Sequence, residues 1–305
     1  NGKEVLTVKN AKKWLSLSLA GVLLTGLLAG CGGGNTPPAS SAPSAPVSTT
    51  PVEGGILKYG TASEPTGFDP HTVSEEASLR IINQLYETLV ATNADMTYYG
   101  QLAESWEIPD DVTYIFYLRK GVKFHNGEEL KASDVAFSFS KIAESPHASS
   151  IRATIDFENS KALDEYTFEM KLTEPFGPIL NHLSHAVMAI VNEKAYTEAG
   201  DQVNEKPCGT GPYKFVAWYP ADRIEMVAFD DYWGEKAAIT NLTWRTIPEI
   251  ASRSIEVEAG TVDVAIDIQA SELARLEKVE KVTTFKEERS SINFICLNNL
   301  IAPFD

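Results

Sequence analysis

The sequence predicts an α/β fold for residues 55–305, because segments patterned like strands and like helices alternate along this whole region. About 250 residues are enough to bury the core of one large domain or of two lobes. Apolar residues make up 43% of the chain and aromatic residues 10%, as in ordinary globular proteins. Together these observations indicate a large globular body built from both kinds of element.

The first elements of this body are a strand and a helix. Residues 56–60 have the pattern of a strand, and a loop rich in proline and glycine follows them. Residues 77–93 predict an amphipathic helix, because apolar side chains recur there every three or four positions. The residues of this apolar face are Leu79, Ile82, Leu85 and Leu89.

A strand–turn–strand passage and a second helix come next. Residues 99–130 alternate in part between apolar and polar side chains, and paired aspartates and an Asn-Gly step supply the turns. Residues 131–145 predict a helix with Ser133 as its N-cap and Asp134 in its positive first turn.

The second half of the body predicts more strands than helices. Residues 166–172 are a strand, and residues 176–196 combine a short helix with a buried apolar segment. Residues 206–220 and 222–234 have the patterns of two paired strands. Residues 241–266 predict a strand, a helix, a turn and a further strand.

Charge and cysteine content exclude several classes of protein. The formal net charge is −16, which argues against nucleic acid as a partner. Cys208 and Cys296 are too few for a disulfide framework. Two interpretations of them stay open: two buried thiols, or one disulfide between them.

The N-terminal region predicts a secretory signal over residues 1–30. Four lysines among the first 13 residues precede a run without charges that reaches Cys31. A transmembrane helix is the competing interpretation, but the run is short for one, is diluted by hydroxyl residues and lacks a charged residue at its far end. We therefore expect an exported protein.

Cys31 is the predicted site of lipid attachment. The residues "LAGC" before and at this position resemble the lipobox of bacterial lipoproteins, in which the cysteine is acylated after cleavage. Residues 31–54 are nearly all small, polar or proline, a composition that forms a flexible linker. We expect an anchor on the outer face of the bacterial cytoplasmic membrane, or on the periplasmic side where a second membrane exists.

No catalytic, metal or cofactor site is predicted. The sequence contains neither a Gly-x-Ser-x-Gly elbow nor a His-Glu-x-x-His motif, which argues against an exported hydrolase. His182 and His185 could share a helical face, but evident partner ligands are lacking. Residues 209–212 (Gly-Thr-Gly-Pro) lack the lysine of a phosphate-binding loop and are interpreted as a turn into a strand.

Five stretches, in this order and spacing, resemble the extracellular solute-binding proteins of family 5, the oligopeptide, dipeptide and nickel receptors of ABC importers. The resemblance covers residues 55–305. The stretches are "LAESWEIPDD" (102–111), "FYLRKGVKFHNGEELKASDVAFS" (116–138), "CGTGPYKF" (208–215), "DYWG" (231–234) and "AGTVDVA" (259–265).

The resemblance implies a type II periplasmic-binding fold, in which two lobes close on a ligand. Residues 55–68 and 186–288 would build the first lobe, and residues 69–185 an extra subdomain of that lobe. Residues 289–305 would start the second lobe, most of which we expect to be missing from this chain.

The resemblance also points to cleft residues. Val73, Ser74, Glu75 and Glu76 match a segment that faces the cleft in the peptide-binding relatives, where backbone groups could pair with an extended peptide. The alternative for them is a solvated acidic helix start. His147 falls where the relatives place another cleft residue, although the loop length differs here.

The expected function is therefore a monomeric, lipid-anchored receptor, not an enzyme. It would capture oligopeptides or dipeptides and deliver them to the permease subunits of an importer, with affinity gained by closing a cleft. Two alternatives stay open: a receptor for a nickel chelate or another small solute, and a peptide-sensing lipoprotein not coupled to import.

Overall fold

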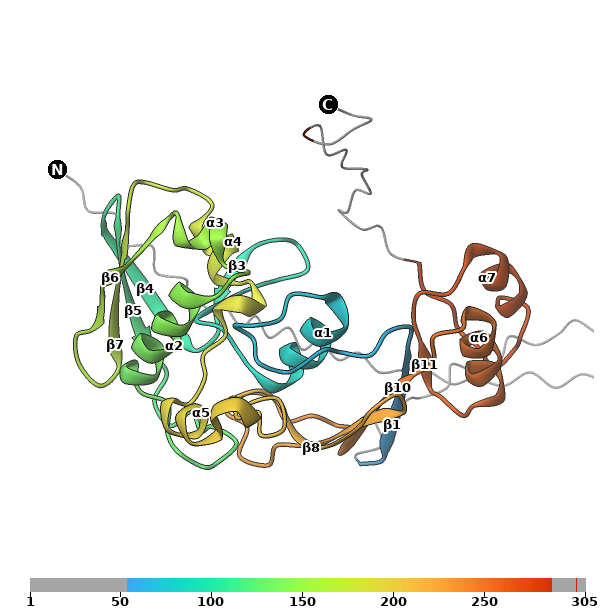
Figure 1. The fold of residues 1–305 in the computed structure, drawn as a ribbon. Helices are drawn as coiled ribbons and strands as arrows, with labels where there is room; N and C mark the ends of the chain where they lie inside the picture. The colour runs from blue at the N-terminus through green and yellow to red at the C-terminus, as the bar shows by residue number, and fades with distance from the viewer. Residues whose placement is uncertain (1–53, 287–299, 301–305) are drawn as a thin grey trace, which may run out of the picture. The chain divides into compact units, whose positions relative to one another are not determined.

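The computed structural model describes residues 54–286 and residue 300, and contains a five-stranded sheet with the order β11-β1-β10-β9-β8 (Figure 1). β1 (Ile56–Thr61) pairs in parallel with β10 (Asn241–Thr246) and β11 (Val264–Ala265). β9 (Arg223–Ala228) pairs antiparallel with β10 and with β8 (Tyr213–Tyr219). The sheet thus joins the start of the described region to its last third.

The register between β1 and β10 brings large side chains together. Leu57 lies opposite Leu242 and Tyr59 opposite Trp244. The rings of Tyr59 and Trp244 are tilted, with centroids 4.2 Å apart. Because side chains of alternate strand residues share a face, these four residues lie on one side of the sheet.

A four-stranded antiparallel sheet has the order β4-β5-β7-β6 (Figure 1). Its strands are β4 (Ala103–Asp110), β5 (Thr113–Leu118), β6 (Ile155–Ala162) and β7 (Thr167–Leu172). Helix α2 (Ala132–Glu144) packs against β6 and β7.

The remaining elements are short. A hairpin is formed by β2 (Val90–Thr92) and β3 (Tyr98–Gly100). The helices outside α2 are α1 (Glu76–Leu85), α3 (Ser149–Arg152), α4 (Ile179–Leu183), α5 (Glu193–Ala199), α6 (Ile250–Ala259) and α7 (Ala270–Leu276), with 3-10 turns at Ala186–Met188 and Gly200–Gln202.

Most predicted elements are confirmed, and two details are wrong. The helix predicted over residues 77–93 ends at Leu85, because the backbone carbonyl of Leu85 accepts a hydrogen bond (3.0 Å) from the N–H of Gly211 and Tyr86 is extended. The N-cap of α2 is Lys131 and not Ser133. Asp134 accepts the Lys131 backbone N–H (3.0 Å), so the acidic residue caps the helix from within its first turn.

The buried residues form two hydrophobic clusters. One fills the space around the four-stranded sheet and α2. The other joins α1, through Ile81, Ile82 and Leu85, to Tyr213 and Trp244 of the five-stranded sheet. The predicted lobe boundaries at residues 68/69, 185/186 and 288/289 stay predictions.

Several predictions lie outside the described residues: the signal peptide, Cys31, the linker up to residue 53, and Cys296. Among the described residues Cys208 is a free, partly buried thiol, and burial raises its pKa to about 11. Within residues 54–286 no helix has the length and apolar character needed to cross a bilayer.

Candidate ligand-binding surface

The loop between β1 and α1 carries three of the predicted cleft residues, Val73, Ser74 and Glu75, and the fourth, Glu76, begins α1. Oε1 of Glu75 accepts hydrogen bonds from the backbone N–H (2.9 Å) and hydroxyl (2.8 Å) of Thr66, and from the hydroxyl of Ser78. Burial alone would raise the pKa of Glu75, but these hydrogen bonds outweigh it and lower the pKa to about 2. The carboxylate therefore holds the loop together at neutral pH.

The other residues of this segment divide between core and surface. Val73 is buried and packs in the cluster beside α1. Ser74 and Glu76 are exposed. Of the four predicted residues, these two present most of their side chains to solvent.

Further contacts fix the loop upstream of Val73. The side-chain oxygen of Asn204 accepts the backbone N–H groups of Phe68 (2.7 Å) and Asp69 (3.1 Å). Asp69 in turn accepts the backbone N–H of His71 (3.0 Å) and the hydroxyl of Tyr196 (2.9 Å). A segment without regular secondary structure is thus held by side chains from distant parts of the chain.

His147, predicted from a different region, lies against the same loop. Its Nε2 donates to the backbone carbonyl of Thr72 at 3.1 Å. The structure therefore brings His147 next to the segment 73–76, although about 70 residues separate them in the sequence. Whether these residues touch a ligand stays a prediction.

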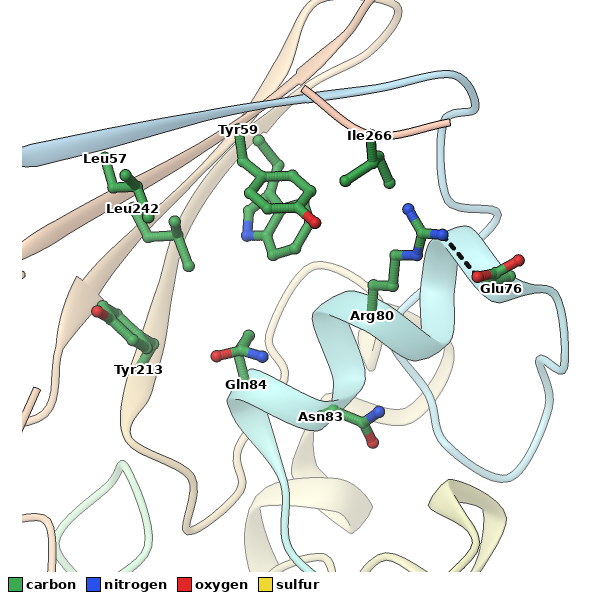
Figure 2. Close-up of a pocket in the computed structure, with 10 residues that line it drawn as sticks. Leu57, Tyr59, Glu76, Arg80, Asn83, Gln84, Tyr213, Leu242 and Ile266 are labelled. Atoms are coloured by element: carbon green, nitrogen blue, oxygen red, sulfur yellow. Dashed lines mark hydrogen bonds and ion pairs between the residues drawn. The ribbon is translucent and has the colours of Figure 1, made fainter. Parts of the chain in front are cut away.

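A pocket of about 460 Å³ lies between α1 and the five-stranded sheet (Figure 2). Figure 2 shows Arg80 and Gln84 extending from α1 toward the strands that carry Leu57, Tyr59 and Leu242. The volume is within the range of small-ligand sites. The complete lining is Leu57, Tyr59, Glu76, Arg80, Asn83, Gln84, Tyr213, Leu242, Trp244 and Ile266.

The polar groups of the pocket differ in their pairing. Arg80 forms an ion pair with Glu76 (2.5 Å) and a second one with Asp267 (3.6 Å). The indole N–H of Trp244 is buried and has no hydrogen-bond acceptor in the part of the chain that the structure describes. The indole N–H of Trp244 is therefore a buried neutral donor without a partner among the described residues.

Of the residues that line the pocket, only Glu76 is among the cleft residues predicted from the sequence. The pocket depends on strands far apart in the sequence, since β1 pairs with β10. The sequence pattern alone does not reveal that order. Alternation in "NLTWRT" could only indicate that Leu242 and Trp244 share a face.

Two of the sequence motifs, residues 208–215 and 231–234, meet at one buried carboxylate, Glu87. It accepts hydrogen bonds from the hydroxyls of Thr210 and Tyr232 (both 2.8 Å), the indole N–H of Trp233 (2.7 Å) and the amide of Gln101 (3.3 Å). Burial raises the pKa of Glu87, and these four donors oppose that rise. Tyr232 and Trp233 thus both donate to this buried carboxylate.

His125, from the motif 116–138, binds the same Gly-Thr-Gly motif that carries Thr210. Its Nε2 donates to the carbonyl of Gly211 (3.0 Å), and its Nδ1 accepts the N–H of Gly209 (3.3 Å). Both roles require a neutral ring, and burial lowers the pKa of His125 to about 4. His125 is therefore a buried, neutral part of the turn.

The Gly-Thr-Gly loop also fixes the end of α1, and so one wall of the pocket. A Cβ at Gly209 would lie 2.1 Å from the carbonyl oxygen of Leu85, and one at Gly211 would lie 2.4 Å from that of Gln84. Only glycine permits this approach, and the turn leads into β8 as predicted. The motif therefore has an architectural role.

Within residues 54–286, no group of three His, Cys, Asp or Glu residues is arranged to hold a metal ion. What the described surface provides is a braced loop and a pocket that combines apolar walls with the polar side chains of Glu76, Arg80, Asn83 and Gln84. Glu76 directly follows the loop and lines the pocket. This arrangement suits noncovalent capture of a small molecule or peptide.

Known proteins similar to this chain are binding proteins. The glutathione-binding protein GsiB of Pectobacterium atrosepticum is 29% identical over 246 residues, which cover 79% of this chain and 47% of that protein. The heme-binding protein A of Haemophilus influenzae is 29% identical over 273 residues, with 81% and 50% covered. The chain spans about half the length of these relatives.

Solved structures agree on the fold. The ABC transporter-associated periplasmic binding protein DppA of Helicobacter pylori, in complex with the peptide STSA, matches with a TM-score of 0.69 and 29% identity. The match covers 75% of this chain and 49% of DppA. The α/β fold is thus that of the periplasmic binding proteins, and all three relatives are named as binding proteins and not as enzymes.

The model of the bacterial extracellular solute-binding proteins, family 5 (middle part), matches residues 97–305. This range includes all five sequence motifs from residue 102 onward. The chain belongs to the family 5 bacterial extracellular solute-binding proteins.

Proposed function

We propose that this chain is part of a peptide receptor that captures oligopeptides or dipeptides outside the cell and delivers them to the permease of an ABC importer. One observation carries the proposal: a preformed pocket adjoins a loop that is already braced for binding. A braced loop loses little conformational entropy when a ligand binds, so contacts with its backbone can contribute fully to affinity.

The bracing also favours a peptide as the ligand. Glu75 and His147 fix the backbone on either side of Val73 and Ser74. An extended peptide can add to such a backbone segment through main-chain hydrogen bonds that do not depend on its sequence. Support for peptides comes also from the complex of DppA with STSA.

Native mass spectrometry of the purified, lipid-free protein tests this function. We expect a ladder of co-purifying masses that disappears on unfolding and returns when peptides are added. A single adduct of the mass of a metal chelate or a sugar would contradict the peptide proposal, as would a protein that ignores added peptides.

We further propose that Cys31 carries a lipid and that the receptor acts as a monomer at the outer face of the membrane. The apolar run before Cys31 and the linker after it support this. Fractionation of cells expressing Cys31→Ala tests it: the variant should leave the membrane fraction, and retention there would contradict lipid anchoring.

A further inference from the structure

His71 is buried in the loop that leads to residues 73–76, and one of its ring nitrogens has no partner. The side chain belongs to a residue that is 1% exposed, and its Nε2 lies 3.1 Å from the backbone carbonyl oxygen of Ala189. A carbonyl oxygen only accepts, so Nε2 carries the proton and donates it to this bond. Nδ1 is buried, and no described residue forms a hydrogen bond with its lone pair. The ring can therefore take up a second proton only at Nδ1.

The ring of His71 ties a turn to the protein interior. The backbone N–H of Thr72 donates to the backbone carbonyl of Asp69 (3.2 Å), and the N–H of His71 donates to the Asp69 carboxylate (3.0 Å). Ala189, which accepts from the ring, belongs to the hydrophobic cluster beside α1. The turn 69–72 leads directly into the predicted cleft segment 73–76, so the anchor of the turn also positions that segment.

The folded loop accommodates a neutral ring better than a charged one. Oδ1 of Asp69 lies 3.9 Å from Nδ1, which is too far for a hydrogen bond. Burial lowers the pKa of His71 below 6.5, and the nearby Asp69 carboxylate offsets this only in part. When the loop opens, water solvates the ring and the pKa returns to about 6.5. The open loop therefore binds a proton more readily than the folded loop, and acid favours opening.

The groups that face the ring from other elements do not reverse this sign. The charge of Lys141, on α2, lowers the pKa of His71 further, and its ammonium is paired with Glu144 (3.1 Å). Burial raises the pKa of Tyr86 and of Tyr196, so both hydroxyls stay neutral in acid.

The two other braces of the loop keep their contacts in weak acid. The pKa of Glu75 is about 2, so its carboxylate stays charged. Nε2 of His147 donates to the carbonyl of Thr72 at 3.1 Å, and this nitrogen carries a proton in both the neutral and the charged ring. His71 is thus the group of the loop whose contact depends on a neutral ring.

We propose that His71 is a positioning residue for the candidate ligand-binding loop: its neutral ring holds the turn 69–72 in place, and proton uptake at Nδ1 releases the turn. This inference rests on the proposed receptor function and adds a regulation to it. The receptor retains its ligand at neutral pH and releases it faster in acid, because opening of the loop frees the ligand.

Amide hydrogen exchange of the ligand-free protein, followed by NMR, measures the opening at the N–H groups of Asp69 and Thr72. Their protection, relative to an unstructured chain at the same pH, should fall about tenfold between pH 7.5 and pH 5.5, because the open loop binds one more proton. His71→Gln retains an N–H donor for Ala189 but does not titrate, so its profile should be flat. His147→Gln is the matched control beside the same loop and should keep the tenfold fall.

Side-chain 15N NMR of the wild type gives an answer even if His71→Gln folds poorly. We expect the proton of the neutral His71 ring on Nε2 and a titration midpoint below pH 6.5. A proton on Nδ1 at neutral pH, or a midpoint at or above pH 6.5, would overturn the proposal.

The tetrapeptide STSA serves as the ligand probe. Its dissociation rate from the wild type should rise about tenfold between pH 7.5 and pH 5.5, in proportion to loop opening, and should change less than about twofold in His71→Gln. Protection that does not vary with pH overturns the role of His71 and leaves the receptor function standing. A dissociation rate that does not vary with pH overturns release in acid. If neither STSA nor any other peptide binds, the receptor function fails, while the exchange profile still decides whether His71 holds the loop.

Discussion

Replacing Glu87 by alanine should destabilise the protein by about 3 kcal/mol. Thr210 is fully buried, so its hydroxyl would lose its acceptor and no water could replace it. This unpaired hydroxyl should lower the free energy of unfolding by about 1–3 kcal/mol. Tyr232, Trp233 and Gln101 are only half-buried, so water can partly replace their contacts, at about 0.5–1 kcal/mol each. Relief of the buried carboxylate, whose pKa burial raises, offsets part of the total.

Thermal unfolding followed by circular dichroism measures this loss. For a domain of this size, about 3 kcal/mol corresponds to a fall in Tm of about 6–12 °C. Glu158→Ala, at an exposed position of β6, is the matched control and should change Tm by less than about 2 °C. A similarly small change in Glu87→Ala would refute the view that the motifs are held together through this carboxylate.

Three further outcomes follow from the same contacts. His125 has its pKa lowered from 6.5 to about 4, so the unfolded chain takes up the proton first and stability falls by about 3 kcal/mol as pH drops through that window. His125→Gln should flatten this part of a urea-denaturation profile, and an unchanged slope would contradict the assignment. Gly211→Ala places a methyl carbon 2.4 Å from a carbonyl oxygen of α1 and should lower the free energy of unfolding by about 1–3 kcal/mol. The midpoint of urea denaturation measures this loss, and an unchanged midpoint would show that the loop can move freely. The pKa of Glu75 is depressed, so the stabilisation that its carboxylate provides is present above pH 4.5 and is lost as pH falls toward 2. Glu75→Ala should speed amide hydrogen exchange at Thr66 at neutral pH. Equal exchange rates in the variant and the wild type would contradict the view that Glu75 holds the loop.

The sequence predicted the kinds of element well because their signals are local. The strand predicted over residues 166–172 is β7, and the paired strands predicted over residues 206–220 and 222–234 are β8 and β9. The N-cap at Ser133 and the length of the first helix were wrong for one reason. Both ends are decided by particular hydrogen bonds: the Lys131 N–H donates to the Asp134 carboxylate at one end, and the Gly211 N–H donates to the Leu85 carbonyl at the other.

The candidate site was predictable only in part. The segment 73–76 and His147 came from resemblance, and their adjacency emerged from the hydrogen bond to Thr72. The structure gave Glu75 the role of a brace, since its donors Thr66 and Ser78 are identified only once the loop is folded. The sequence held no comparable signal for the pocket at Trp244.

The sequence by itself determined the α/β class, the membership in a solute-binding family and the motifs that mark it, because periodicity and motif order are properties of the chain. The tertiary structure alone decided what those motifs do. Glu87, Thr210 and Trp233 lie far apart in sequence. Folding removes them from water, and Thr210 and Trp233 then donate their hydrogen bonds to the carboxylate of Glu87. The pairing of β1 with β10 in the same way placed Tyr59 beside Trp244 and created the pocket.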